Sequence, residues 1–413
     1  MSNSRVDQTD PDRLRLGWLR CFCIDAWIRH VRSYPEQSCS KQSGRLFHRG
    51  SLEHESEKGS IRVRSTFAPE TCHERLFSIR PELSYDDGND LCSWVSQLRA
   101  CLEEVMGLAP EPVDLNIRIQ YDRSVLNQYR EVRFIFSSEE GADVPCHLLL
   151  PKTTSSEPYP VMICLQGHST GMHISLGRLK YDGDEEAILG GRDYAIQGVR
   201  RGYAVLTLEQ RAFGERKDSR EGAMNKGCHH ATATALLLGR TMVGERVFDV
   251  SRSIDALEEM ESTGALGTDR IDLSRIGCMG NSGGGTITYY ASCLDTRITA
   301  LMPSCSVCTY VESIGRIDHC TDNYMPGALR FFDIPDLAGL IAPRPLVLVS
   351  GREDPIFPIE AVEKAFETIC RIYRRFDAES LCHLVVGDGG HRFYPDQAWP
   401  VFQEVTGWIS QNS

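Results

Sequence analysis

The stretch Gly280-Asn281-Ser282-Gly283-Gly284 stands between a short apolar run at 275–279 and residues 284–293, which we expect to form a helix. This is the arrangement of a nucleophile elbow, in which a serine occupies a sharp turn from a strand into a helix. The flanking glycines keep side chains out of the place where strand and helix meet. The turn would present the Ser282 hydroxyl at its tip, and the backbone N–H of Gly283 could donate a hydrogen bond to a developing oxyanion.

A serine in such a turn needs partners, because its hydroxyl is a weak nucleophile at neutral pH. Residues 346–350 (LVLVS) predict a buried strand, and Asp354 lies in the loop that follows it. A later apolar run ends at 384–386, and the Gly-rich loop after it holds His391. In this interpretation His391 takes the serine proton and Asp354 orients the imidazole. Taken singly, each residue reads as an ordinary loop or turn residue; their order and placement together favour a triad.

The apolar run at 160–165 predicts an early central strand, and it leads into Gln166-Gly167-His168-Ser169. In folds that carry such an elbow, the loop after the third strand donates the second oxyanion N–H. We expect His168 to supply that backbone donor, with Ser169 as the next candidate. The His168 side chain would then shape the pocket, rather than serve as a metal ligand or a second base.

These motifs resemble the α/β-hydrolase superfamily, and within it the dienelactone-hydrolase-like and acetyl-xylan-esterase-like serine esterases. The resemblance extends from Val132 to the C-terminus. It rests on 165–168, on 200–205 leading to 209–214, on the elbow, on 341–345 and on 390–391. It implies that Ser282, Asp354 and His391 are the triad and that Gly283 and His168 form the oxyanion hole. It implies no single substrate, because this fold hosts esterases, peptidases, thioesterases and lactonases.

Two positions depart from the superfamily pattern. The oxyanion segment more often has His where this chain has Gln166, and the segment after the next strand usually has Asp where this chain has Glu209. Because the oxyanion donor is a backbone group, we expect function to survive the first change. We interpret Glu209 as structural, pairing with Arg211 or capping the following turn; the alternative role for Arg211 is to reach a substrate carboxylate or carbonyl.

The pattern along the chain predicts an α/β fold with a mostly parallel central sheet, helices on both faces and antiparallel N-terminal strands. Residues 89–106 have helical apolar spacing. Residues 113–150 alternate as strands, with Val132, Phe134 and Phe136 on one face and a turn at 141–143. From 161 onward, strands alternate with helices.

We divide the chain into a disordered or poorly ordered extension at 1–60, a helical segment at 61–125 packed on the domain, and a catalytic domain at 126–413. The insert at 304–330 follows a predicted strand and is expected to act as a lid over the pocket. The alternative is a loop that only covers the sheet edge. With Gln166, Ser169 and Arg211, the insert residues Tyr310 and Tyr324 are the candidate pocket residues.

Composition excludes several classes of function. The net charge of -12 argues against a nucleic-acid or anionic-membrane partner. No run is long enough for a transmembrane helix, and the apolar stretch at 17–28 is interrupted by Arg20 and Asp25. We find no cleavage site there for a secretory signal, so the expected location is cytoplasmic.

Sixteen cysteines are many for this length. Several fall in apolar contexts, which favours free buried thiols over disulfides. The pair Cys305-x-x-Cys308 followed by His319-Cys320 suggests zinc, but the second pair lacks the usual spacing. The stretch Cys228-His229-His230 is interpreted as loop and pocket lining. We therefore expect no metal, and no phosphate-loop motif indicates a nucleotide cofactor.

The resulting hypothesis is a cofactor-independent serine hydrolase that cleaves small-molecule carboxylic esters through an acyl-enzyme. A peptidase or thioesterase with the same triad is the first alternative. A catalytically silent ligand-binding homologue is the second; it is disfavoured because all three triad positions hold competent residues.

Overall fold

The computed structural model describes residues 68–152, 157–218 and 227–409. All of them belong to one compact unit, Ser65–Ser413. The extension predicted at 1–60 lies outside the described residues.

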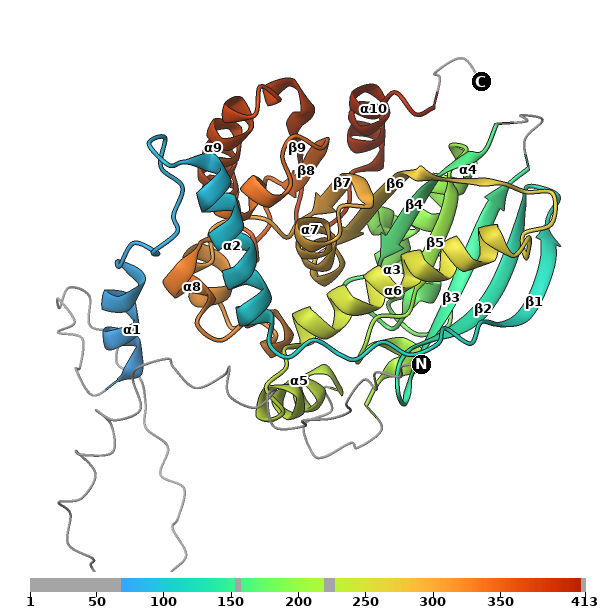
Figure 1. Ribbon diagram of the computed structural model, residues 1–413, viewed down its shortest axis with the longest axis horizontal. Helices are drawn as coiled ribbons and strands as arrows, with labels where there is room; N and C mark the ends of the chain where they lie inside the picture. The colour runs from blue at the N-terminus through green and yellow to red at the C-terminus, as the bar shows by residue number, and fades with distance from the viewer. Residues whose placement is uncertain (1–67, 153–156, 219–226, 410–413) are drawn as a thin grey trace, which may run out of the picture. The chain divides into compact units, whose positions relative to one another are not determined.

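Nine strands form one sheet in the order β1-β2-β3-β5-β4-β6-β7-β8-β9 (Figure 1). The pairs β1–β2, β2–β3 and β3–β5 are antiparallel, and every later pair from β5–β4 to β8–β9 is parallel. The predicted α/β fold is therefore confirmed. The strands are β1 Arg118–Val125, β2 Tyr129–Glu139, β3 Ala142–Pro151, β4 Tyr159–Leu165, β5 Ala204–Leu208, β6 Ile271–Asn281, β7 Ile298–Ser304, β8 Leu346–Gly351 and β9 Cys382–Gly387.

The antiparallel part of the sheet follows the predicted alternation. Val132, Phe134 and Phe136 of β2 are all buried. The turn lies one residue earlier than predicted, because β3 already begins at Ala142. Strand β1 falls within the segment 61–125, interpreted above as helical, and forms the edge of the sheet.

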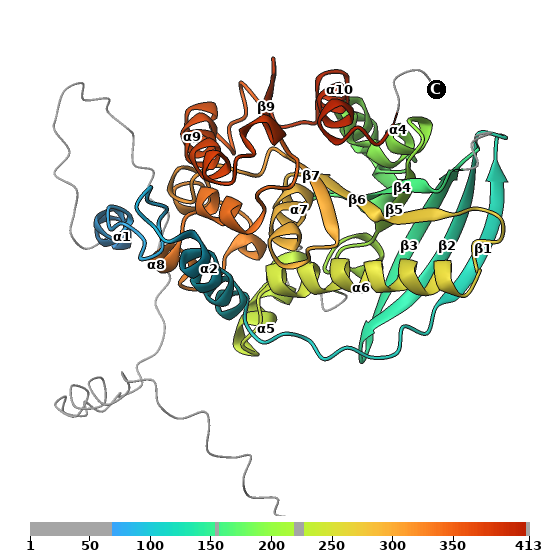
Figure 2. The same ribbon diagram turned by 45° about the horizontal axis from the view of Figure 1, so that its top comes forward.

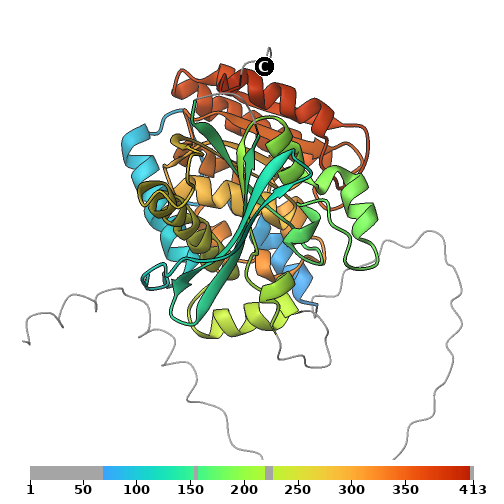
Figure 3. The same ribbon diagram turned by 90° about the vertical axis from the view of Figure 1, so that its right-hand side faces the viewer.

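Helices cover both faces of the sheet, as Figures 2 and 3 show. Helices α4 and α10 contribute to one apolar core with Trp399 and Phe402, whereas α2, α6, α7 and α9 contribute to the other. The α-helices are α1 Pro69–Phe77, α2 Leu91–Met106, α3 Asp184–Ala187, α4 Tyr194–Arg200, α5 Gly227–Leu237, α6 Met242–Ser262, α7 Gly283–Leu294, α8 Ala328–Phe331, α9 Ile359–Arg375 and α10 Pro395–Thr406. No helix in the described ranges has both the length and the apolar composition needed to cross a bilayer.

The central strands are buried on both faces, because helices cover each side of a parallel sheet. Every residue of β8 is buried, as is all of β4 except Tyr159. Parallel strands direct their carboxyl ends to one edge. The loops after β4, β6, β8 and β9 therefore emerge together, and ligands of open α/β sheets bind at that edge.

The turn from β6 into α7 requires glycine because it lies against the end of β4. A Cβ atom on Gly284 would lie 2.0 Å from the carbonyl oxygen of Leu165, a backbone atom that cannot move aside cheaply. We expect Gly284→Ala to lower the free energy of unfolding by about 3 kcal/mol or more. The matched control is Gly190→Ala, where the nearest atom to the added Cβ would lie 3.8 Å away. Denaturant unfolding of both variants measures the difference; equal losses would contradict the close approach.

Candidate functional site

Ser282 occupies the turn between β6 and α7 with φ 58° and ψ -127°. A positive φ is costly for a residue with a side chain, and such strain gathers at functional sites. Neighbouring backbone holds the turn: Ser282 N donates to Ser304 O at 2.8 Å, and Thr286 N donates to Ser282 O at 2.9 Å. The predicted elbow geometry is present, with the serine half-buried at its tip.

Asp354 and His391 lie together, although they are on different loops. Asp354 follows β8 and His391 follows β9, and Nδ1 of His391 lies 2.8 Å from Oδ2 of Asp354. The other carboxylate oxygen of Asp354 accepts hydrogen bonds from the backbone N–H groups of Ile356 and Phe357 at 2.9 and 3.2 Å. The carboxylate is therefore held by two backbone N–H groups of its own loop, by the imidazole and by the Cys305 side chain.

Burial would raise the pKa of Asp354, but the hydrogen bond and charge of His391, with the two backbone N–H groups, hold it below its usual range. The Phe357 ring stacks on the imidazole of His391, with ring centroids 5.9 Å apart and an angle of 15° between planes. The carboxylate thus stays ionised at neutral pH, and the imidazole is held by one hydrogen bond and one stacked ring.

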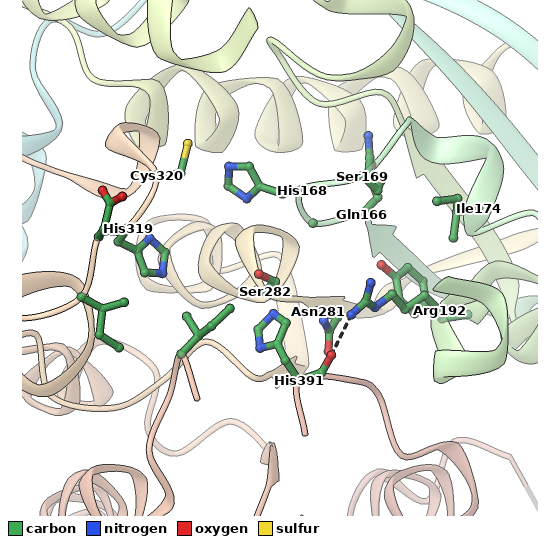
Figure 4. A pocket seen from close by; sticks show the side chains of 15 residues that line it. Gln166, His168, Ser169, Ile174, Arg192, Asn281, Ser282, His319, Cys320 and His391 are labelled. Carbon is green, nitrogen blue, oxygen red and sulfur yellow. Dashed lines mark hydrogen bonds between the residues drawn. The ribbon is translucent and has the colours of Figure 1, made fainter. Parts of the chain in front are cut away.

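Ser282 and His391 line the same cavity, which has a volume of about 290 Å³ (Figure 4). Within the described residues, Ser282 Oγ has no hydrogen-bond partner, whereas His391 Nδ1 is bonded to Asp354. Catalytic hydrogen bonds are often long in ligand-free sites and tighten on binding. The hydroxyl is therefore free to turn toward the imidazole or toward a bound molecule.

The loop after β4 faces the elbow across this cavity. A Cβ atom on Gly167 would lie 2.5 Å from Asn281 O, so only glycine allows the two loops to meet this closely. The same construction on Gly283 places His168 Nδ1 3.3 Å away. His168 and Gly283, the two predicted oxyanion donors, are thus neighbours, and His168 lines the cavity.

The His168 side chain points to a buried carboxylate. Its Nε2 lies 2.9 Å from Oδ2 of Asp322, which also accepts from Arg246 Nη1 at 2.9 Å. Burial would lower the pKa of His168, but the hydrogen bonds and charges of Asp322 and Cys320 raise it to about 9. The ring also lies edge-on to Phe213, with centroids 4.8 Å apart.

The two residues that depart from the superfamily pattern contact each other. Gln166 Nε2 donates to Glu209 Oε1 at 2.6 Å. The Glu209 carboxylate also accepts from Met172 N at 3.0 Å and from Glu215 N at 3.3 Å, so it caps the following turn as one of its predicted roles required. Burial raises the pKa of Glu209 to about 7, although those backbone hydrogen bonds oppose the rise.

Arg211 forms no ion pair with Glu209 and does not line the cavity. Its guanidinium binds Asp249, with Nε to Oδ2 at 2.8 Å and Nη2 to Oδ1 at 2.9 Å, and it also pairs with Glu139. Arg211 is absent from the cavity lining. Both roles predicted for it are corrected: buried carboxylates on β2 and α6 hold the charge, since a guanidinium left unpaired there would be costly.

Of the other pocket candidates, Gln166 and Ser169 line the cavity, whereas Tyr310 and Tyr324 do not. Tyr310 is buried in the core, and its hydroxyl pairs with that of Tyr290. Tyr324 Oη donates to Ile314 O at 2.8 Å. The insert at 304–330 reaches the cavity through residues 317–320 instead. That it acts as a lid stays a prediction.

Arg192 is a cavity residue that the sequence did not indicate. Its Nη2 donates to the backbone oxygen of His391 at 2.7 Å, the dashed line in Figure 4. Its Nε is buried and has no hydrogen-bond partner among the described residues. Arg192 lies between β4 and α4 in a stretch with no motif, and only the folded chain brings it to His391.

Comparison with known proteins gives a consistent picture. Residues 56–371 match the model of the Abhydrolase family. A Bacillus subtilis (strain 168) protein named "Putative hydrolase YtaP" is 27% identical over 258 residues, 60% of this chain and 77% of that protein.

Two solved structures share the fold. The first is a "putative acetyl xylan esterase" from Bacteroides fragilis NCTC 9343, with a TM-score of 0.64 and 18% identity over 79% of this chain and 84% of that one. The second is a glucuronoyl esterase from Solibacter usitatus, with a TM-score of 0.58 and 17% identity over 80% of this chain and 97% of that one.

The raised pKa of Glu209 predicts a pH-dependent stability. Ionisation of this buried carboxyl destabilises the folded state but not the unfolded state. The stability that protonated Glu209 contributes is therefore fully present below pH 4.5 and is lost as pH rises through about 7. We expect the unfolding free energy of the wild type, relative to Glu209→Gln, to fall by about 3 kcal/mol across that window. Urea unfolding of both proteins at several pH values measures this difference. A difference that stays constant with pH would contradict the assignment.

Proposed function

Because the chain belongs to the Abhydrolase family, we propose that it is a serine hydrolase that cleaves carboxylic esters through an acyl-enzyme. One observation supports the proposal most directly. His391 lies 2.8 Å from Asp354, and it lines the same cavity as Ser282, which occupies a strained turn. The three residues come from three separate loops, and their types match the needs of nucleophilic catalysis.

The hydrogen bond at Nδ1 of His391 leaves Nε2 as the atom that receives the Ser282 proton. Serine Oγ then attacks the ester carbonyl and forms a tetrahedral intermediate. The ionised Asp354 stabilises the imidazolium that results. The backbone N–H groups of Gly283 and His168 hold the oxyanion.

Collapse of this intermediate breaks the bond to the alcohol, which takes its proton from His391 and leaves. The acyl group stays on Ser282. Water then enters, His391 accepts one of its protons, and the second tetrahedral intermediate releases the acid and restores Ser282. The same two N–H groups serve both intermediates, so the cavity needs no rearrangement between the two halves of the reaction.

The cavity favours small ester groups. Its volume of about 290 Å³ lies at the lower end of the range for small-molecule sites. Gln166, Ser169 and Arg192 supply polar groups to its wall. The names of the two structural neighbours, esterases of xylan acetyl and glucuronoyl groups, support the same class.

Ser282→Ala tests the nucleophile. We expect a fluorophosphonate probe to label the wild type and not the variant, and kcat for a short-chain p-nitrophenyl ester to fall by roughly 10³-fold or more. Ser262→Ala, on the surface of α6, is the matched control and should keep both signals. Acetyl, long-chain, thioester and amide substrates run alongside separate an esterase from a thioesterase or peptidase. A folded wild type that neither labels nor turns over would favour the ligand-binding alternative.

Asp354→Asn tests the orienting acid. An amide in place of the carboxylate cannot stabilise the imidazolium, so we expect kcat to fall by about 10³ to 10⁴-fold at neutral pH with little change in KM. Steady-state kinetics measure the effect, and circular dichroism checks that the variant is folded. Asp388→Asn, in the same loop as His391 and highly exposed, is the control and should keep wild-type rates. Equal activity in both variants would remove Asp354 from the triad.

A further inference from the structure

Four side chains that can bind metal meet beside the cavity. His168 follows β4, Cys228 lies in α5, and Cys320 and Asp322 lie in the insert after β7. One ligand atom from each residue lies within 4.8 Å of the corresponding atoms of the other three. The two sulfur atoms are 3.3 Å apart, and His168 Nε2 lies 2.9 Å from Asp322 Oδ2.

The four donors suit one kind of ion. Two thiolates, an imidazole and a carboxylate are the ligand types of tetrahedral zinc sites. With Zn–S near 2.3 Å and Zn–N or Zn–O near 2.0 Å, the ligand atoms of such a site lie about 3.3 to 3.8 Å apart. The two contacts given above need to open by a few tenths of an ångström, and any pair at the 4.8 Å limit needs to close by about 1 Å. We propose that His168, Cys228, Cys320 and Asp322 bind one Zn²⁺ ion. Binding releases to solvent the two thiol protons and the proton that His168 Nε2 shares with Asp322.

The groups around the four donors hold them in place. Arg246 Nη1 and Asn323 Nδ2 donate to the two oxygens of Asp322 at 2.9 and 3.0 Å. Arg246 in turn donates through Nε and Nη2 to Arg211 O. Outer hydrogen bonds of this kind orient metal ligands and tune their affinity.

Charge balance also favours a divalent cation. Two thiolates and the Asp322 carboxylate carry three negative charges, of which the buried Arg246 guanidinium balances one. A Zn²⁺ ion balances the other two. Cys228, Asp322 and Arg246 are buried, and unpaired charge is expensive there, so the neutral, metal-filled cluster is the arrangement in which both cysteines can be ionised.

The described residues offer a contrasting pair of thiols. Cys370 and Cys382 also contact each other through sulfur, but they join no group of three potential ligands there. The other group that meets this criterion, Cys305 with Asp354 and His391, contains the proposed base and acid. The cluster at His168 therefore differs from both in its four donors, which include two thiols. The zinc proposal does not depend on the proposed ester hydrolysis.

Zinc binding by the full-length protein tests the site. Protein stripped with a chelator under reducing conditions is titrated with Zn²⁺ against a chromogenic chelator, and with Co²⁺ to read the absorption of tetrahedral, thiolate-bound cobalt. We expect about one tight equivalent per chain and a rise in melting temperature on zinc binding. Cys228→Ser and Cys320→Ser should each weaken zinc binding by more than about 100-fold and abolish the thiolate-to-cobalt band.

The double variant Cys370→Ser with Cys382→Ser is the matched control and should bind zinc like the wild type. If either single cysteine variant fails to fold, two measurements still test the site: zinc binding by Asp322→Asn, which should be weakened, and the cobalt spectrum of the wild type, which should show thiolate ligands. Reduced wild type that binds no tight zinc would overturn the proposal. So would a zinc affinity that is unchanged in folded Cys228→Ser and Cys320→Ser.

Discussion

The contact between the elbow and the end of β4 is the constraint on which the site depends. Gly284 lies so close to the Leu165 carbonyl that no side chain fits, and the approach of Gly167 to Asn281 O also excludes a side chain. These two approaches bring the loop of the proposed nucleophile against the loop of the proposed oxyanion donor. The parallel pairing of β4 with β6 sets their height at the sheet edge. The strained backbone of Ser282 is thus held by neighbours that are themselves buried.

His391, on the other side of the site, is held by hydrogen bonds and ring stacking and not by close backbone packing. His391 is oriented by Asp354, by the Phe357 ring and by the Arg192 hydrogen bond to its carbonyl. None of these partners lies in β6 or α7, so the proposed base is positioned independently of the proposed nucleophile. Ser282 Oγ has no hydrogen-bond partner in the described residues, which agrees with this division. In the proposed reaction, its hydrogen bond to His391 would form in the complex with substrate.

The fold and the loop positions of the three proposed triad residues could be predicted from the sequence, because both depend on patterns within short stretches of the chain. An apolar run followed by a polar loop marks the carboxyl end of each central strand, and this placed Ser282, Asp354 and His391 at one edge. The pocket wall could be predicted only in part: Gln166 and Ser169 line the cavity, whereas Arg211, Tyr310 and Tyr324 do not. The sequence favours pairing of Arg211 with Glu209, with contact to a substrate as the alternative, because its carboxylate partners, Glu139 and Asp249, are distant in sequence. Long-range charge pairs leave no periodic or spacing signal, so only the folded chain identifies them.

The cysteines also show that contacts between residues distant in sequence could not be predicted. The sequence groups Cys320 with Cys305 and Cys308, which are near it in the chain, yet its sulfur contacts that of Cys228, 92 residues away. His168 links this cluster to the cavity, since its main chain lies at the elbow while its Nε2 faces Asp322. An ion bound there would tie the loop after β4 to the insert that forms the opposite wall. The position of the proposed oxyanion donor and the width of the cavity would then depend on the same four side chains.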